Sequence, residues 1–381
     1  MTKLLFISNI SKRVGSFSVA SIYSSKACGI DFYYASNWSA SPLETRRADE
    51  EKFGIKLEHI DLVRSPFSFK NYKAYKQLLD IIRNERIDYI HCNTPVGGLL
   101  GRLAGSKCGV RKVIYQAHGF HFYKGAPIIN WLIYYPIERI LAHFTDALIT
   151  INREDYERAK KFHLRNQGTV YYVPGVGINT NDYEAGSFDR VRKRQTLSFN
   201  DDDVLVVSAG DLIKRKNYKT AIEAIARTKN DRIHYLICGT GPLRNKLEKY
   251  AAKIGVAKRI HFLGYRTDMK EILLASDIYL FTTYQEGLPR SLSEAMACGL
   301  PCVASRIRGN EDLIDSDDVG YLFTPNDVQG FSNAIYDLSQ NPELRKRMGL
   351  LSKRRILSFN IETVKKCISE AYKKEFIGVD N

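Results

Sequence analysis

The sequence predicts an α/β fold with two doubly wound parallel-sheet domains, for three reasons. The chain has 381 residues, which exceeds the length that one hydrophobic core usually serves. Short apolar runs alternate with helical patterns in both halves, as in parallel sheets with crossover helices. Pro174, Gly175 and Gly177 interrupt the alternation, so we expect the two domains to join there.

The elements of the first half are expected in alternation. Each expected strand is short, apolar and rich in β-branched or aromatic residues, whereas the expected helices carry apolar residues at helical spacing. We expect strands at residues 4–7, 87–91, 112–116 and 147–151, and helices at residues 71–83 and 98–105.

The second half repeats this scheme. We expect strands at residues 204–208, 234–238, 260–263 and 277–282, and helices at residues 218–228, 243–254, 269–275, 291–297 and 361–376. Ligands of open α/β sheets bind at the carboxyl ends of the strands, so the loops that follow these strands are the expected functional segments.

Composition narrows the class of protein. The formal net charge of +15 favours an anionic partner, which leaves nucleic acid, an anionic membrane surface or a phosphorylated substrate. The chain has no nucleic-acid-binding motif, so nucleic acid is the weakest of the three. The sequence contains no uninterrupted run of 18 apolar residues, so we expect no transmembrane helix. Seven scattered cysteines without a CxxC pair predict reduced thiols and a cytoplasmic location.

Two carboxylates frame a loop and a helix start in the last third of the chain. Glu286 and Glu294 are separated by a Gly-Leu-Pro breaker, and Pro289 suits the first turn of a helix that ends before Gly299. Free N–H groups at such a helix start bind phosphate. We expect Glu286 at the mouth of the loop and Glu294 about two turns into the helix, within reach of a ribose diol.

This segment resembles the E-x7-E motif of the retaining glycosyltransferases of the GT4 family. Residues 210–217 resemble the phosphate-binding GRLxxxKG stretch of that family, and residues 239–242, 264–268 and 117–120 resemble three further loops. The resemblance covers essentially the whole chain, and residues 91–152 resemble the branch that builds bacterial capsular polysaccharides and exopolysaccharides.

The resemblance implies the GT-B fold, in which two Rossmann-like domains face each other across a cleft. The last helix of GT-B proteins returns to the first domain. We therefore expect a first, acceptor-side domain of residues 1–173 plus 359–381 and a second, sugar-nucleotide-binding domain of residues 174–358.

The resemblance also implies roles for individual residues. His118 is expected to touch the donor sugar, and Glu286 is expected near the sugar hydroxyls or the anomeric carbon. Lys216 is expected at the diphosphate and Glu294 at the ribose. The expected donor-binding residues are Lys216, Gly241, Tyr265, Arg266, Gly287, Leu288, Pro289, Arg290, Ser291 and Glu294, and the acceptor-side residues are Gly15, Ser16 and Thr94.

The sequence departs from the family pattern at Asp211, where the family has an arginine. Either Lys216 and the helix start carry the diphosphate charge, or Lys214 or Arg215 substitutes for that arginine. Residues 201–203 offer an Asp-x-Asp spacing, but they precede a strand, and a solvated turn is the favoured interpretation. We therefore expect no metal and no other cofactor.

Basic residues are frequent in the first domain, and we expect them to meet an anionic membrane. They are Arg64, Lys70, Lys73, Lys76, Arg102, Lys107, Arg111 and Lys112. Trp131, Tyr134 and Tyr135 lie in an aromatic segment that is interpreted as core rather than as a lipid-contacting surface.

The expected activity is metal-independent, retaining transfer of a hexose or N-acetylhexosamine from a UDP-sugar to a lipid-linked oligosaccharide. The enzyme is expected in the cytoplasm, held peripherally at the inner face of the membrane. Two alternatives remain: a soluble synthase or phosphorylase of the same fold that acts on a small sugar, and a non-catalytic basic binding protein. Failure to pellet with membranes favours the first alternative, and saturable UDP binding counts against the second.

Overall fold

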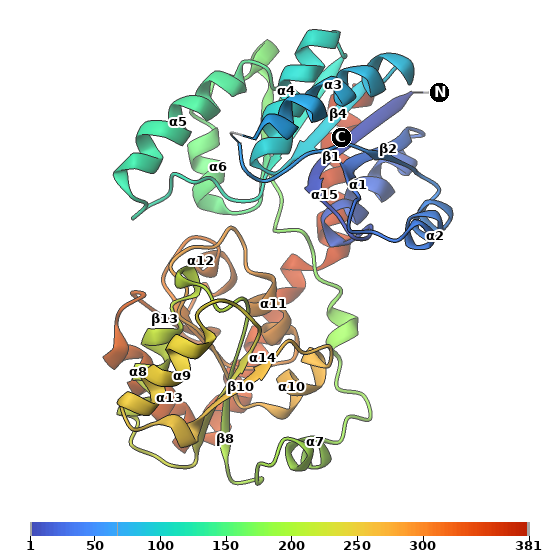
Figure 1. Ribbon diagram of the computed structural model, residues 1–381. Helices are drawn as coiled ribbons and strands as arrows, with labels where there is room; N and C mark the ends of the chain where they lie inside the picture. Colours follow the sequence, from blue (N-terminus) through green and yellow to red (C-terminus); the bar gives the residue numbers. More distant parts are fainter. Residues whose placement is uncertain (1, 67, 379–381) are drawn as a thin grey trace. The chain divides into compact units, whose positions relative to one another are not determined.

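A computed structural model describes residues 2–66 and 68–378. The chain forms two compact units, one of Met1–Gly177 with Ile361–Asn381 and one of Ile178–Asn360 (Figure 1). Each unit contains one parallel sheet with helices on both faces, as the sequence predicts. Among the described residues, no helix combines the length and the apolar character needed to cross a bilayer.

In the described part of the first unit, seven strands form a parallel sheet in the order β3-β2-β1-β4-β5-β6-β7. Their bounds are β1 Lys3–Ile10, β2 Asp31–Asn37, β3 Lys56–His59, β4 Tyr89–Asn93, β5 Lys112–Ala117, β6 Ala147–Thr150 and β7 Thr169–Tyr172. The chain reverses its direction of travel across the sheet between β1 and β4. That switch point is where sheets of this kind bind ligands.

Helices cover both faces of the first sheet. They are α1 Ser16–Ala27, α2 Leu43–Phe53, α3 Phe69–Asn84, α4 Pro95–Cys108, α5 Ile128–Ala142, α6 Arg153–Ala159 and α15 Ile361–Tyr372. Alternate residues of β1 point to opposite faces. Leu4 joins a core with α1 and α15, whereas Leu5 joins a core with α3 and α4. The end of the chain thus packs against its beginning.

In the described part of the second unit, six strands form a parallel sheet in the order β10-β9-β8-β11-β12-β13. The strands are β8 Val204–Ala209, β9 Ile233–Cys238, β10 Ile260–Gly264, β11 Ile278–Phe281, β12 Cys302–Ser305 and β13 Gly320–Phe323. The helices are α7 Arg190–Thr196, α8 Tyr218–Arg227, α9 Arg244–Lys253, α10 Met269–Ala275, α11 Arg290–Ala297, α12 Asn310–Leu313, α13 Val328–Gln340 and α14 Pro342–Ile356. The switch point lies between β8 and β11.

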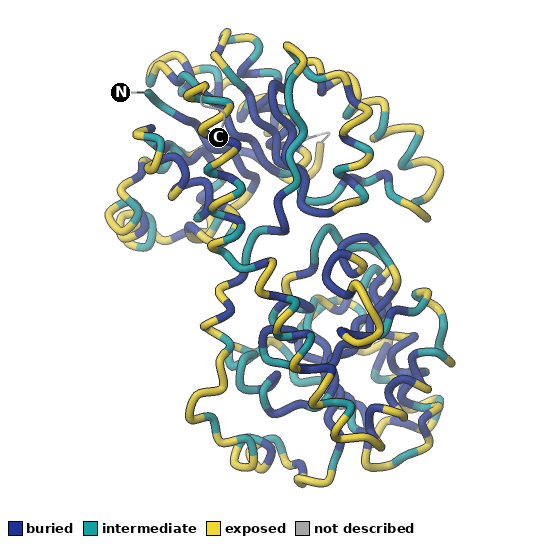
Figure 2. Tube along the Cα trace, turned by 180° about the vertical axis from the view of Figure 1, so that it is seen from behind, coloured by how far each residue is buried: buried dark blue, intermediate teal, exposed yellow. Residues whose placement is uncertain are grey.

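The strands are the most buried part of each unit, and exposed residues gather on the outer sides of helices and loops (Figure 2). Helix α5 differs from the expectation for its aromatic residues. Trp131 and Tyr135 pack against the core, but Tyr134 is exposed and stacks on His121 with 4.5 Å between ring centroids. The interpretation of this segment as core therefore holds for two of the three aromatic residues.

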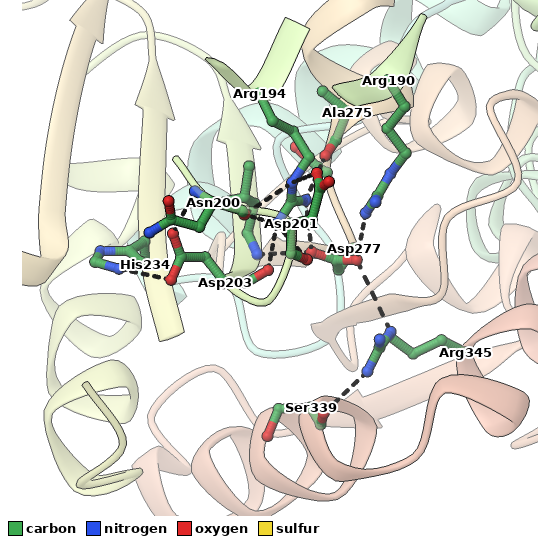
Figure 3. A network of polar contacts seen from close by, with 12 residues as sticks. Arg190, Arg194, Asn200, Asp201, Asp203, His234, Ala275, Asp277, Ser339 and Arg345 are labelled. Carbon is green, nitrogen blue, oxygen red and sulfur yellow. Dashed lines mark hydrogen bonds and ion pairs between the residues drawn. The ribbon is translucent and has the colours of Figure 1, made fainter. Parts of the chain in front are cut away.

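A polar network lies at the amino ends of β8 and β11, at the edge of the second sheet opposite the functional loops (Figure 3). The fully buried Arg194 of α7 donates to the carbonyl of Ala275 at 2.9 Å and contacts Asp277 at 3.2 Å. Asp277 also accepts from the backbone N–H of Leu205 at 2.8 Å and from Arg190 at 2.6 Å. The network joins α7 to both strands.

Candidate functional site

Lys216, Glu286 and residues 287–294 lie at the carboxyl ends of β8 and β11, whereas Gly241, Tyr265 and Arg266 follow β9 and β10. Lys216 ends a 3₁₀ turn, Lys214–Lys216, that follows β8. Its ammonium lies 2.9 Å from the carboxylate of Glu286, and the Arg215 guanidinium lies 2.6 Å from the same oxygen. The Thr283 hydroxyl donates to that oxygen at 3.0 Å. Two cations therefore converge on one carboxylate at the switch point.

The loop of Gly287, Leu288 and Pro289 is held close to a neighbouring loop. Arg308 is buried and donates to the backbone carbonyl of Glu286 at 3.0 Å. Gly309 has φ +80°, and a Cβ there would meet the Gly287 carbonyl oxygen at 2.2 Å. Only glycine fits that approach, so Gly309 sets the position of the loop.

Helix α11 begins at Arg290, so Pro289 precedes the first turn, in which the sequence places it. Pro289 is its N-cap, with φ −79° and ψ 119°, and Arg290 and Ser291 are the first helical residues. Glu294 therefore lies little more than one turn into the helix, not two. Arg290 donates to its carboxylate at 2.8 Å. Burial and the neighbouring Glu294 carboxylate raise the pKa of Tyr183, which lies against α11.

The loops after β8, β9 and β10 are joined by close backbone contacts. The N–H of Gly239 donates to the Gly264 carbonyl at 2.7 Å. A Cβ at Gly241 would meet backbone atoms of Leu212 at 2.7 Å, so this residue must be small. Tyr265 follows Gly264 and is 78% exposed, which leaves its ring open to stack on a planar group.

Arg266 lies in the same loop but is held by its neighbours. Its guanidinium makes two hydrogen bonds to Asp268, at 2.8 and 2.6 Å, and these hold the pKa of the Asp268 carboxyl well below its usual range. Lys193 pairs with the same carboxylate at 2.6 Å. Arg266 thus serves first to fix this loop.

The first unit brings His118 together with residues at the ends of β1 and β4. His118 Nε2 lies 2.8 Å from the side-chain oxygen of Asn93, the last residue of β4. The Phe17 ring packs edge-on against the imidazole with 5.0 Å between centroids. The Thr94 hydroxyl donates to Asn9 at 2.8 Å. The switch point of the first sheet thus carries its own cluster of polar side chains.

The acceptor-side residues of the prediction lie at two helix starts in this cluster. Gly15 is the N-cap of α1, and Ser16 is its first residue. Thr94 is the N-cap of α4 and has φ +66°, which is strained for a β-branched residue. Such strain is concentrated at functional sites, which favours a role for this turn.

The surroundings keep His118 neutral. Burial lowers the pKa of its imidazole to about 4. Among the described residues, its Nδ1 atom and the side-chain amide nitrogen of Asn93 are buried without a hydrogen-bond partner. A neutral imidazole with one free nitrogen can exchange a single hydrogen bond with a hydroxyl group.

The Asp-x-Asp segment lies away from these loops. Asp201 and Asp203 precede β8, at the opposite edge of the sheet from Lys216. The Asp203 carboxylate accepts from the Asn200 N–H at 2.7 Å, as in a local turn. Within the described parts of the chain, no three His, Cys, Asp or Glu side chains are grouped to hold a metal ion.

The sequence did not single out four residues that the structure places at the site: Arg215, Asn93, Arg308 and Tyr183. Arg215 was considered only as a substitute for the arginine that the family has at Asp211. Asp211 is exposed, whereas the Arg215 side chain contacts Glu286. Asn93 gave one signal, its position at the end of an apolar strand. Arg308 and Tyr183 gave none, because their roles depend on contacts between distant segments.

Comparisons with known proteins identify the family of the chain. The model of glycosyl transferases group 1 matches residues 189–355, and that of glycosyl transferase 4-like proteins matches residues 40–152. "Putative glycosyltransferase EpsD" of Bacillus subtilis (strain 168) is 36% identical over 316 residues, which are 82% of this chain and 81% of that protein.

A second relative has a more specific name. The UDP-Gal:alpha-D-GlcNAc-diphosphoundecaprenol alpha-1,3-galactosyltransferase of Escherichia coli is 29% identical over 74% of each chain. Among solved structures, Anabaena HepE in complex with UDP and glucose has a TM-score of 0.78 at 21% identity, over 98% of this chain and all of that one. The chain therefore belongs to the GT4 family of glycosyltransferases and is a transferase enzyme with the GT-B fold.

Proposed function

We propose that the enzyme transfers a hexose or N-acetylhexosamine, with retention of configuration, from a UDP-sugar to a lipid-linked oligosaccharide in bacterial capsule or exopolysaccharide synthesis. One observation supports the donor assignment most directly. Lys216 and Arg215 both contact Glu286 at the switch point, and Glu294 lies on the helix that follows. A nucleoside diphosphate needs cations at its phosphates and an acceptor at its ribose hydroxyls, and this loop system contains both.

The chemistry assigned to the second unit is stabilisation of the leaving UDP. Negative charge develops on the diphosphate as the glycosidic bond breaks. Lys216 and Arg215 supply positive charge, and the start of α11 adds backbone N–H groups. Glu286 holds both cations in place before the donor arrives, because a shared carboxylate restricts the rotamers of two long side chains. Arg215 then takes the place of the arginine that the family has at Asp211.

The roles of the remaining residues follow from their hydrogen-bonding capacity. Glu294 accepts from the ribose diol, and Tyr265 stacks on the uracil ring. His118 exchanges a hydrogen bond with a hydroxyl of the transferred sugar through its free Nδ1 atom. The acceptor is assigned to the first unit, beside the helix starts at Gly15, Ser16 and Thr94.

Two comparisons support the substrates. Anabaena HepE was crystallised with UDP and glucose, which supports a uridine nucleotide in this fold. The name of the Escherichia coli relative gives a UDP-sugar donor and a diphosphoundecaprenol acceptor. A lipid-linked acceptor also requires that the enzyme works at a membrane, and we propose the cytoplasmic face.

The transfer is proposed to need no metal, because cationic side chains take the role that a metal has in other glycosyltransferases. Treatment with EDTA should leave the rate of transfer unchanged. If transfer is lost in EDTA and Mn²⁺ or Mg²⁺ restores it, this proposal is contradicted. Residues 201–203 then become the candidate metal-binding segment.

A panel of nucleotide sugars incubated with enzyme and a membrane lipid extract tests the proposed function. One UDP-sugar should give a lipid product heavier by one hexose or N-acetylhexosamine in mass spectrometry. NMR of the new linkage should show the anomeric configuration of the donor. Transfer to a small free sugar alone favours the soluble synthase instead.

A further inference from the structure

Helix α5 is apolar around most of its circumference, but the protein covers only one side of it. The covered side contains Trp131 and Tyr135, which pack against the core, and Leu141 and Ala142, which are buried. Six other large apolar residues are between 43% and 77% exposed: Ile128, Ile129, Leu132, Ile133, Ile137 and Ile140. A helix that is apolar on all sides is normally buried, so this exposed face indicates a contact surface for a partner.

The exposed residues form one continuous face. Positions 128, 129, 132, 133, 137 and 140 recur at helical spacing, on the side opposite residues 131, 135, 138 and 142. The helix has 15 residues and is therefore about 22 Å long. That length does not cross a bilayer core of roughly 30 Å. It suits a helix that lies in the plane of the interface.

The charges around this face favour an anionic bilayer over a second copy of the chain. Glu138 is the only acid between residues 128 and 143. Its carboxylate pairs at 2.8 Å with the buried Arg102. Arg139 and His143 are exposed at the end of the helix. A second copy would present the same helix, whose one acid already pairs with Arg102, whereas anionic headgroups complement the Arg139 cation.

Of the eight basic residues expected to meet the membrane, four pair with acids, and the other four are exposed: Arg64, Lys70, Lys76 and Lys107. Arg102 is buried, Arg111 lies 3.3 Å from Asp88, and Lys112 lies 3.3 Å from Glu375. These acids offset much of their charge. Apolar contact through α5 would add to the attraction between the exposed cations and an anionic membrane.

We propose that the exposed face of α5 docks the enzyme in the interface of an anionic bilayer, with the helix axis in the membrane plane. This inference rests on the proposed function in one respect, the lipid-linked acceptor that gives the docking its purpose. The exposed Tyr134 suits the headgroup level, because it combines an apolar ring with a polar hydroxyl.

Co-sedimentation with vesicles tests the proposal. Leu132→Glu places a charge on the face, and Leu350→Glu on α14 is the matched control, since the two leucines are 67% and 69% exposed. The wild type should bind mixed phosphatidylglycerol–phosphatidylcholine vesicles, and Leu132→Glu should bind at least tenfold more weakly. Leu350→Glu should bind as the wild type does. Equal binding by all three proteins overturns the proposal, as does no binding by the wild type.

Two further measurements separate this inference from its rivals. Sedimentation velocity without lipid should show a monomer, and a dimer that Leu132→Glu dissociates assigns the face to a second copy and overturns the proposal. Transfer to a short-chain, water-soluble lipid pyrophosphate should be equal in the wild type and Leu132→Glu. If vesicle binding depends on Leu132 but the enzyme transfers no sugar, the docking face is supported and the proposed function is contradicted.

Discussion

His118 and Asn93 form the contact in the first unit that bears most directly on chemistry. The Asn93 side chain is almost fully buried, and its oxygen lies 2.8 Å from His118 Nε2. Asn93 therefore acts as a positioning residue, because an Nε2–H that donates to it leaves Nδ1 as the free acceptor. His91 interacts electrostatically with His118, and burial lowers the pKa of His91 to about 3, so it stays neutral as well.

Asn93→Asp should make the enzyme sensitive to pH near neutrality. The pKa of His118 is about 4 in the wild type, so the neutral imidazole persists down to that pH. A carboxylate beside Nε2 favours the imidazolium and raises the pKa. The fall of kcat/KM on the acid side should therefore move to higher pH. His118→Gln in the same background should remove the shift, and an unchanged pH profile contradicts the positioning role.

At the residue scale, the sequence predicts which chain segments carry the site but not how their side chains pair. The order of the motif-like loops indicates Glu286, Glu294 and Lys216, because each has a local signature. The pairing of Arg215 and Lys216 with Glu286 joins positions 70 and 71 residues apart. Such a contact depends on the neighbouring strands β8 and β11, which no local pattern specifies.

At the scale of elements, the network around Asp277 shows how α7 is attached to the second sheet (Figure 3). Asp277 is 9% exposed and accepts from Arg194, Arg190 and the Leu205 backbone. When Asp277 is removed, the buried Arg194 keeps a 3.9 Å contact with the exposed carboxylate of Asp201. That contact and the carbonyl dipoles compensate a buried cation poorly. The pair therefore matters more for stability than an exposed ion pair.

Asp277→Ala should destabilise the second unit by about 3–5 kcal/mol, the range for removing one partner of a buried pair. Asp202→Ala is the control, because its 3.7 Å contact with Arg232 is exposed and contributes at most about 1 kcal/mol. Trp38 and Trp131, the only tryptophans, both lie in the first unit. In urea, the second-unit transition seen by far-UV circular dichroism should shift, while the tryptophan fluorescence transition should not. A shift of the tryptophan transition alone contradicts the assignment.

The sequence predicts eight of the thirteen strands in the described part of the chain and misses β2, β3, β7, β12 and β13. All eight expected strands are present, because each is a buried apolar run between breakers. Strand β3 was missed because Lys56–His59 is polar and only partly buried at a sheet edge. Helix α2 was missed because its sequence is mostly charged, with one buried residue, Asp49. Tertiary contacts decide both elements, and the pattern within each is too weak to predict them.

At the scale of the whole molecule, the net charge of +15 does not form one uniform basic surface. Several cations of the first unit are paired with acids, and two cations of the second unit converge on the donor loops. The sequence predicts the sum of the charges, whereas their distribution follows from the fold. Diphosphate binding and membrane docking are accordingly assigned to different residues.

The central claim is that the loops around Glu286 and Glu294 bind the uridine nucleotide. Titration calorimetry with UDP tests it most directly, using the wild type, Glu294→Gln, Glu286→Gln and the exposed control Glu343→Gln of α14. Hydrogen bonds to a charged group contribute about 1.5–3 kcal/mol. Each 1.4 kcal/mol corresponds to about tenfold in affinity, so Glu294→Gln should bind UDP roughly 10- to 100-fold more weakly.

The control should bind as the wild type does. Glu286→Gln keeps a side-chain oxygen that can accept from Lys216 and Arg215, so its UDP affinity should stay within about threefold, a change of roughly 0.7 kcal/mol. Its turnover should fall more than its UDP affinity, because its carboxylate acts on the sugar side of the donor. Unchanged UDP affinity in Glu294→Gln, or no saturable binding by the wild type, contradicts the donor site.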